Sequence, residues 1–300
     1  MGAPNLLLEL LVEELPPKAL CKLGEALAQS LLASLKAQGL TDAQSVVTAY
    51  ASPRRLAAHI TQVAPRAADR PVRQKLMPVS VGFDAQGQPT PALLKKLQAL
   101  GVTDSASAVA ALQRAPDGKA EALFYDSVAP GVDLASGLQK ALDEALAKLP
   151  IPKVMQYQLH SDCELPGWSS VNFVRPAHGL IALHGDQVVP VAALGLRAGR
   201  QTRGHRFEAQ REVIEIGDAD AYASTLLTQG SVIAHFDERR AEIARQLAAA
   251  AAQVGGGARP IEDEALLDEV TALVEHPSVY VGAFDPEFLQ VRSEEHTSEL

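Results

Sequence analysis

A cluster of cations between residues 197 and 206 is the stretch of this chain most able to do chemistry. It holds Arg197, Arg200, Arg203, His205 and Arg206, separated by glycines. An arginine guanidinium is a planar fork of donors that matches a phosphate group, and glycines let backbone N–H groups approach an anion. Because an apolar, strand-like run precedes the cluster, we predict a rigidly held loop that binds a polyanion. An exposed basic loop without a ligand is the alternative.

A second pair of cations, Arg54 and Arg55, lies in a predicted turn between two strands. These side chains could contact a phosphate or pair with Glu13 or Glu14, and the sequence favours neither. Glu13 and Glu14 are adjacent, so in a strand they would point to opposite faces. That geometry is poor for a pair of catalytic carboxylates, and we interpret them as a charged strand end.

No familiar catalytic or metal-binding motif is present. The chain has no P-loop, no GxGxxG after a strand and no GxSxG elbow. His160 and Cys163 flank Asp162 and could hold a metal, although a solvated loop is favoured. His178 and His184 lie beside apolar strand residues, which indicates packing or hairpin positions. We therefore predict no catalytic residue and no metal site in this chain.

Composition limits the class of protein. Three hundred residues suggest about two domains. The net charge of −9 excludes a chain that is basic throughout, so any nucleic-acid contact must come from local patches. Two cysteines provide no disulfide framework and suit a reducing compartment. The apolar run 6–12 is too short to span a bilayer. These features predict a soluble, cytoplasmic protein without a membrane partner.

Hydrophobic periodicity predicts the elements that must position the cations. Apolar runs predict strands over residues 6–12, 46–50, 56–63, 180–183, 188–194, 213–216 and 279–281. Apolar residues at helical spacing, with helix-capping signals, predict helices over residues 20–35, 91–100, 134–149, 220–227, 236–254 and 266–274. Residues 64–91 lack periodicity and are interpreted as a long loop, and residues 106–123 could hold small strands.

This order of elements predicts an α+β fold, with mixed sheets covered by amphipathic helices. Pro150 and Pro152 end a helix, and a second unit that contains a predicted hairpin follows them. We therefore predict two or more domains: an N-terminal α+β domain over residues 1–150, and a second α+β domain with the basic loop over residues 151–291.

Several separated segments, in the same order, resemble the β-subunit family of bacterial heterotetrameric glycyl-tRNA synthetases. They are residues 11–20 (LVEELPPKAL), 52–57 (SPRRLA), 151–153 (IPK), 173–178 (FVRPAH), 199–207 (GRQTRGHRF), 274–277 (VEHP) and 284–289 (FDPEFL). The resemblance covers residues 5–291. It departs from the family pattern at Ser52, in the expanded stretch 156–170, and at Gly179, where the family usually has tryptophan.

The resemblance implies a subunit that binds tRNA and supports the ATP-dependent attachment of glycine to tRNA(Gly). It further implies an α2β2 heterotetramer in which the α subunit holds the active site, ATP and magnesium, with no cofactor in this chain. The fold would be similar to tRNA-binding and editing modules rather than to a class II catalytic core. An editing-type hydrolase of mischarged tRNA and a pure scaffold for the α dimer are the alternatives. The residues expected to contact tRNA are Arg200, Arg203, His205, Arg206 and Arg197, then Arg54 and Arg55.

The last residues, 292–300 (RSEEHTSEL), resemble the translation of a sequencing-adapter oligonucleotide. We predict that this tail is not native and exclude it from reasoning about the fold. A frayed polar terminus is the alternative.

Overall fold

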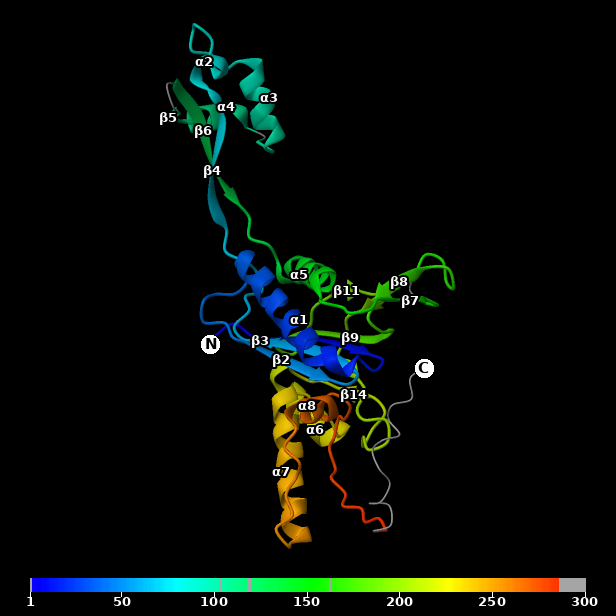
Figure 1. The fold of residues 1–300 in the computed structure, drawn as a ribbon. Helices are drawn as coiled ribbons and strands as arrows, with labels where there is room; N and C mark the ends of the chain where they lie inside the picture. Colours follow the sequence, from blue (N-terminus) through cyan, green and yellow to red (C-terminus); the bar gives the residue numbers. More distant parts are fainter. Residues whose placement is uncertain (1, 103, 118–119, 162, 286–300) are drawn as a thin grey trace, which may run out of the picture.

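A computed structural model describes residues 2–102, 104–117, 120–161 and 163–285. The predicted foreign tail and the end of the segment 284–289 lie outside these residues. The described chain has the predicted α+β fold (Figure 1). The strands are β1 (Leu6–Val12), β2 (Val47–Ser52), β3 (Arg55–Ile60), β4 (Arg70–Pro78), β5 (Gln113–Asp117), β6 (Ala120–Ala129), β7 (Met155–Gln158), β8 (Ser170–Phe173), β9 (Ala177–His184), β10 (Gln187–Val188), β11 (Ala192–Ala193), β12 (Leu196–Arg197), β13 (Gln201–Thr202) and β14 (Ile214–Glu215). The helices are α1 (Pro17–Ala37), α2 (Val79–Gly82), α3 (Pro91–Ala99), α4 (Ser105–Ala110), α5 (Leu134–Lys148), the 3-10 turn η1 (Ala219–Ala221), α6 (Tyr222–Gly230), α7 (Phe236–Val254) and α8 (Glu264–Thr271).

An antiparallel sheet of order β10-β9-β1-β3-β2 forms the centre of the body. β1 lies in its middle, where Leu10 pairs with Leu56 of β3 on one side and Leu180 of β9 on the other. All seven residues of β1 are buried, which explains a strand that is almost continuously apolar. The sheet crosses the predicted domain boundary at residue 150, because β9 hydrogen-bonds along the length of β1. The boundary therefore does not separate two independent sheets.

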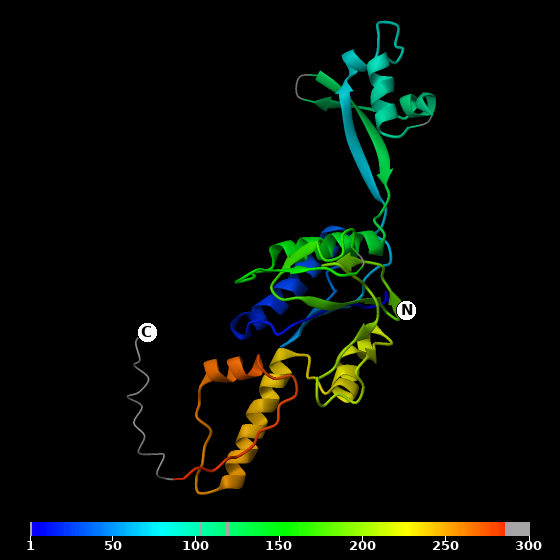
Figure 2. The same cartoon turned by 90° about the vertical axis from the view of Figure 1, so that its right-hand side faces the viewer.

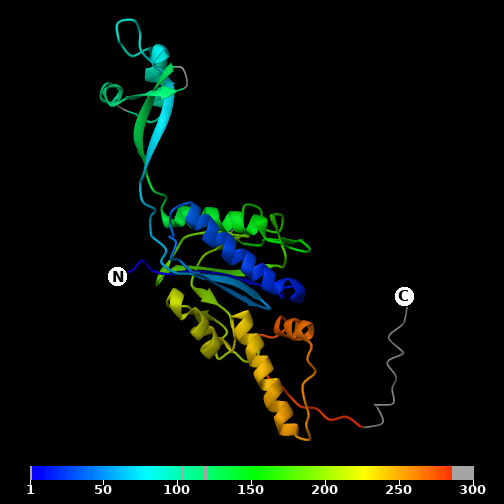
Figure 3. The ribbon, with the colours of Figure 1, turned by 60° about the vertical axis from the view of Figure 1, so that its left-hand side comes forward.

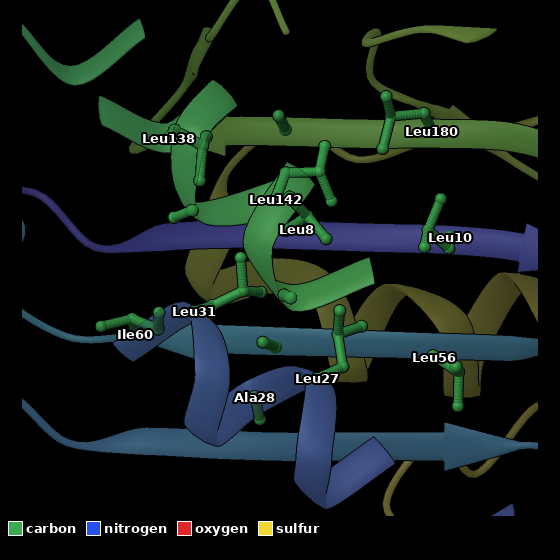
Figure 4. Packing of buried hydrophobic residues seen from close by; sticks show 14 of the residues in the cluster. Leu8, Leu10, Leu27, Ala28, Leu31, Leu56, Ile60, Leu138, Leu142 and Leu180 are labelled. Atoms are coloured by element: carbon green, nitrogen blue, oxygen red, sulfur yellow. The ribbon is translucent and has the colours of Figure 1, made fainter. Parts of the chain in front are cut away.

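Helices α1 and α5 cover one face of this sheet (Figure 4). Leu27 and Leu31 of α1, with Leu138 and Leu142 of α5, are fully buried against Leu8 and its neighbours. Each leucine removed from water stabilises the fold by roughly 1.5–3 kcal/mol. The helical leucine spacing thus identified both helices and the faces that they bury.

The segment that follows the basic loop covers the opposite face. Leu7 of β1 and Ile181 of β9 form a second core with Ile214, Tyr222 and Leu226. The body is therefore three-layered, with α1 and α5 on one side of the sheet and the β14–α6 region on the other (Figures 2 and 3). Asp218 accepts the N–H of Asp220 and so caps the 3-10 turn η1 that leads into α6.

A separate sheet, of order β4-β6-β5, projects from the body with α2, α3 and α4 packed beside it (Figures 1 and 2). Leu93, Leu97, Ala108 and Leu123 form its own small core. The interpretation of residues 64–91 as a loop is wrong, because β4 and α2 lie within it. The first six residues of β4 are all exposed, so the strand has no apolar alternation by which the sequence could reveal it.

The C-terminal part of the described chain is helical, as predicted. α7 and α8 pack against each other, and the strand predicted over residues 279–281 is wrong, since those residues carry no strand. Within the described chain, no helix is both long and apolar enough to cross a membrane.

Candidate nucleic-acid interface

The basic loop lines a polar cleft of about 850 Å³. Residues that are far apart in the sequence meet there: Glu13 after β1, Arg54 in the β2–β3 turn, His178 in β9, and Arg203 and Arg206 in the loop. Each comes from a segment singled out by the sequence. The fold therefore brings separated segments together around one opening.

A second cleft of about 540 Å³ adjoins the first and shares His178 and Arg203 with it. Arg197 and Arg200 line this second cleft. Thr202 also lines it; its side chain is buried, and its hydroxyl finds no hydrogen-bond partner among the described residues. The cations predicted from the sequence are thus distributed along two adjoining hollows.

Arg197, Arg203 and Arg206 are the exposed cations of the loop. The side chain of Arg203 is 62% exposed and lies 3.7 Å from Glu212. The guanidinium of Arg206 pairs with Glu13 at 2.9 Å and with Glu14 at 3.2 Å. Exposed ion pairs contribute at most about 1 kcal/mol, so a phosphate could replace these carboxylates.

Arg200 and His205 are half-buried and bond within the protein. Arg200 donates from Nη2 to the carbonyl of Asp186 at 2.8 Å, which holds the loop against the β9–β10 turn. His205 accepts the N–H of Phe207 and of Glu208 at Nδ1, at 3.3 and 3.2 Å. These two side chains shape the loop.

Arg54 and Arg55 lie beneath the loop. Arg54 donates to the carbonyl of Gly204 at 2.7 Å and to the Glu275 carboxylate at 2.8 Å. Arg55 is fully buried and donates to the carbonyl of Arg203 at 2.8 Å. Their carboxylate partners are Glu275 and Glu9, so of the two alternatives that the sequence left open, the pairing with Glu13 or Glu14 is wrong. Arg55 is shut off from solvent, whereas Arg54 is largely buried and reaches the wall of the first cleft.

Sequence reasoning missed this buried charge cluster. Arg55 lies 3.5 Å from Glu9 and 3.4 Å from Glu275, and the Tyr222 hydroxyl donates to Glu9. Burial opposes the charge on Arg55, but Glu9 and the other anionic neighbours outweigh it and raise its pKa. Burial, reinforced by Glu9, raises the pKa of Tyr222 well above its ordinary value. Glu9 could have revealed this cluster from the sequence, because a carboxylate inside an otherwise apolar, buried strand requires a positively charged or hydrogen-bonding partner.

Glu13 connects the first strand to the cleft. Its carboxylate lies 2.8 Å from Nε2 of His178 and 2.9 Å from Arg206. Partial burial opposes its ionisation, but the hydrogen bond and charge of His178, with the charge of Arg206, lower the pKa of Glu13. His178 lies in β9, a strand of the β9–β10 hairpin, as one of the two predicted alternatives allowed, and its imidazole lines the cleft rather than packing in the core. His184 ends β9 and pairs with Gln187 across the β9–β10 hairpin, as predicted. Its Nε2 donates to the carbonyl of Val63 at 2.6 Å.

Two glycines of the loop, Gly199 and Gly204, have structural roles. The N–H of Gly199 donates to the carbonyl of Leu180 at 3.0 Å. A Cβ on Gly204 would lie 2.5 Å from Cα of Gly230, so only glycine permits this contact between two backbones. The loop is consequently anchored, and its long side chains project from a fixed backbone.

The described residues contain no group of three or more metal-ligating side chains. Of the acidic segment considered for a metal, Asp162 lies outside the described residues. Cys163 contacts the carbonyl of Leu159 at 3.6 Å.

Comparison with known protein families identifies the class of protein to which this chain belongs. The chain matches an aminoacyl-tRNA synthetase family, described as "Glycyl-tRNA synthetase beta subunit", over residues 6–297. The chain belongs to this glycyl-tRNA synthetase β-subunit family. The matched range enters the segment 292–300, whose foreign origin stays a prediction.

Individual relatives agree with the family. The chain is 68% identical over 296 residues to a glycine–tRNA ligase beta subunit of Polaromonas naphthalenivorans, and 67% identical over 295 residues to one of Paracidovorax citrulli. It is 64% identical over 300 residues to that of Dechloromonas aromatica. Each alignment covers 98% of this chain but only 41–42% of the relative. The chain thus spans about two fifths of the length of these relatives.

Proposed function

We propose that this chain is the N-terminal portion of a cytoplasmic glycine–tRNA ligase β subunit, and that it supports glycylation of tRNA(Gly) by binding the tRNA. The observation that carries this proposal is the basic double cleft. Arg197, Arg203, Arg206 and Arg211 are exposed around it, although the chain is acidic overall. Arginines in such a surface supply the phosphate contacts that position RNA.

Within this proposal the exposed and the half-buried cations have different roles. Arg197, Arg203 and Arg206 contact phosphates, whereas Arg200 and His205 shape the loop. Arg54 and Arg55 support it from below. The fold acts as a tRNA-binding module similar to editing modules, and the catalytic site, ATP and magnesium belong to the α subunit of an α2β2 enzyme.

The test is tRNA binding by the assembled α/β enzyme carrying Arg203→Ala and Arg206→Ala. We expect weaker binding and a shallower dependence of log affinity on log salt, by about 1 for each phosphate that the variant no longer neutralises. Arg245→Ala on α7 is the matched control, because Arg245 is 67% exposed and paired with Glu242 at 2.6 Å, away from the cleft. An unchanged affinity and salt slope in the double variant contradicts the proposal. If the protein binds the α subunit but has no affinity for tRNA, a role as a scaffold for the α dimer is favoured instead.

One observation favours a second function, hydrolysis of mischarged tRNA. The Glu13–His178 pair gives the cleft an oriented imidazole, half exposed to solvent, of the kind that could position water. We propose to assay deacylation of mischarged tRNA by the protein and by its His178→Ala variant. Equal rates with and without the imidazole rule this function out.

A further inference from the structure

Phe207 is an exposed aromatic side chain at the end of the basic loop, in a small cavity that shares Arg206 with the first cleft. It is 91% exposed and lies directly after the cation cluster. The exposed phenyl ring contributes little to the stability of the fold, because it buries almost no apolar area. Its exposure leaves the ring free to contact a ligand.

The backbone that carries Phe207 is fixed. The N–H of His205 donates to the carbonyl of Gly230 at 2.7 Å, and His205 in turn accepts the N–H of Phe207. One residue earlier, Arg54 holds the carbonyl of Gly204. The ring is thus presented from an anchored turn rather than from a free loop.

A ring and a small cavity lie beside the exposed phenyl. The His205 imidazole packs edge-to-face against it, with centroids 6.1 Å apart. The cavity has a volume of about 250 Å³, and Phe207, Leu273, Arg206, Glu275 and His276 contribute to its walls. It therefore combines apolar surface with hydrogen-bonding groups, as the recognition of a flat heteroaromatic molecule requires.

We propose that Phe207, supported by His205, is a stacking platform for an unpaired nucleobase of the bound RNA. This inference rests on the proposed function and names the part of the RNA involved. An aromatic ring accepts any base on its π-face, and adjacent arginines hold the flanking phosphates. A base inside a duplex has both faces covered, so the platform selects single-stranded nucleotides.

The test compares a short fluorescein-labelled single-stranded RNA with the blunt duplex of the same sequence, using the assembled α/β enzyme. Phe207→Leu keeps an apolar side chain but removes the π-face. We expect it to weaken single-strand binding by about 5- to 100-fold and to leave duplex binding little changed. Phe207→Trp should restore single-strand binding. Trp168→Leu is the matched control, because Trp168 is an 84% exposed aromatic in the β7–β8 hairpin.

The salt dependence separates stacking from charge. Phe207→Leu should lower affinity for the single strand at every salt concentration without changing the slope, since every arginine that neutralises a phosphate is still present. Full single-strand affinity in this variant, or an equal loss on both RNAs, overturns the platform while leaving tRNA binding intact. If Phe207→Leu weakens association with the α subunit but not RNA binding, Phe207 belongs to a protein interface, and the platform is also overturned. No binding of either RNA by the unsubstituted protein defeats the proposed function itself.

Discussion

Two groups of arginines in this protein have opposite environments. Arg55 and Arg239 are fully buried, whereas Arg203 and Arg206 are more than half exposed. The buried guanidiniums donate to carbonyls, such as that of Arg203 from Arg55 and that of Ala51 from Arg239 at 2.8 Å. The exposed pair meets only surface carboxylates. The comparison shows that backbone acceptors identify an arginine that supports the fold.

Arg55→Ala should lower the free energy of unfolding more than any other substitution considered. Removing this cation leaves Glu9 without its buried positive partner, which costs about 3–5 kcal/mol. Urea denaturation of the complete chain measures the free energy of unfolding, with Arg245→Ala as the control. A decrease in the free energy of unfolding below about 1 kcal/mol would mean that Arg55 contributes no more than an exposed arginine, and the contrast between the two groups would be wrong.

Tyr222→Phe should have the next largest effect. The variant keeps the buried ring but removes the hydroxyl that donates to Glu9, and a buried acceptor left short of a donor costs about 1–3 kcal/mol. The same denaturation assay measures it. Stability equal to that of the unsubstituted protein would show that the cluster does not depend on this hydrogen bond.

Glu13→Gln tests the pH dependence of the cleft. The folded protein has a lowered pKa at Glu13, so its ionised carboxylate stabilises the fold above the ordinary value of 4.5. That contribution disappears as pH falls through the lowered pKa. We expect the stability difference between the protein and this variant to shrink on acidification. Unfolding curves at a series of acidic pH values measure it, and a difference that grows on acidification contradicts the assignment.

Replacing Arg203 and Arg206 by alanine should have the smallest effect on stability. Both side chains are exposed and make only surface ion pairs, so the free energy of unfolding should change by less than about 0.5 kcal/mol. Thermal unfolding of the double variant checks this. A pronounced destabilisation would mean that these arginines, too, belong to the scaffold.

Periodic apolar residues predicted most of the body. The leucines of α1 and α5 and the apolar run of β1 identify their elements, because burial on one or two faces leaves a direct pattern. β4 escaped detection, since its exposed residues carry no such pattern. The pairing of β9 with β1 also escaped, because a single sequence does not show which distant strands meet.

The sequence marks the basic loop, but not which of its cations are exposed, and a role in binding tRNA stays a prediction. The spacing of Arg203 and Arg206 marks a basic loop, but the same residue type at Arg54 and Arg55 lies inside the protein. What separates them is the distant Glu275, which the fold brings beneath the loop. Phe207 was not singled out, because an aromatic side chain usually indicates core until its exposure is known.

Photo-crosslinking of tRNA to the assembled enzyme, followed by identification of the linked peptides, would show whether the basic loop binds tRNA. We expect crosslinks within residues 197–211, the basic loop with Phe207, and their loss in the Arg203→Ala, Arg206→Ala variant. Crosslinks confined to the projecting β4–β6 unit, or absent from the whole chain, would contradict it.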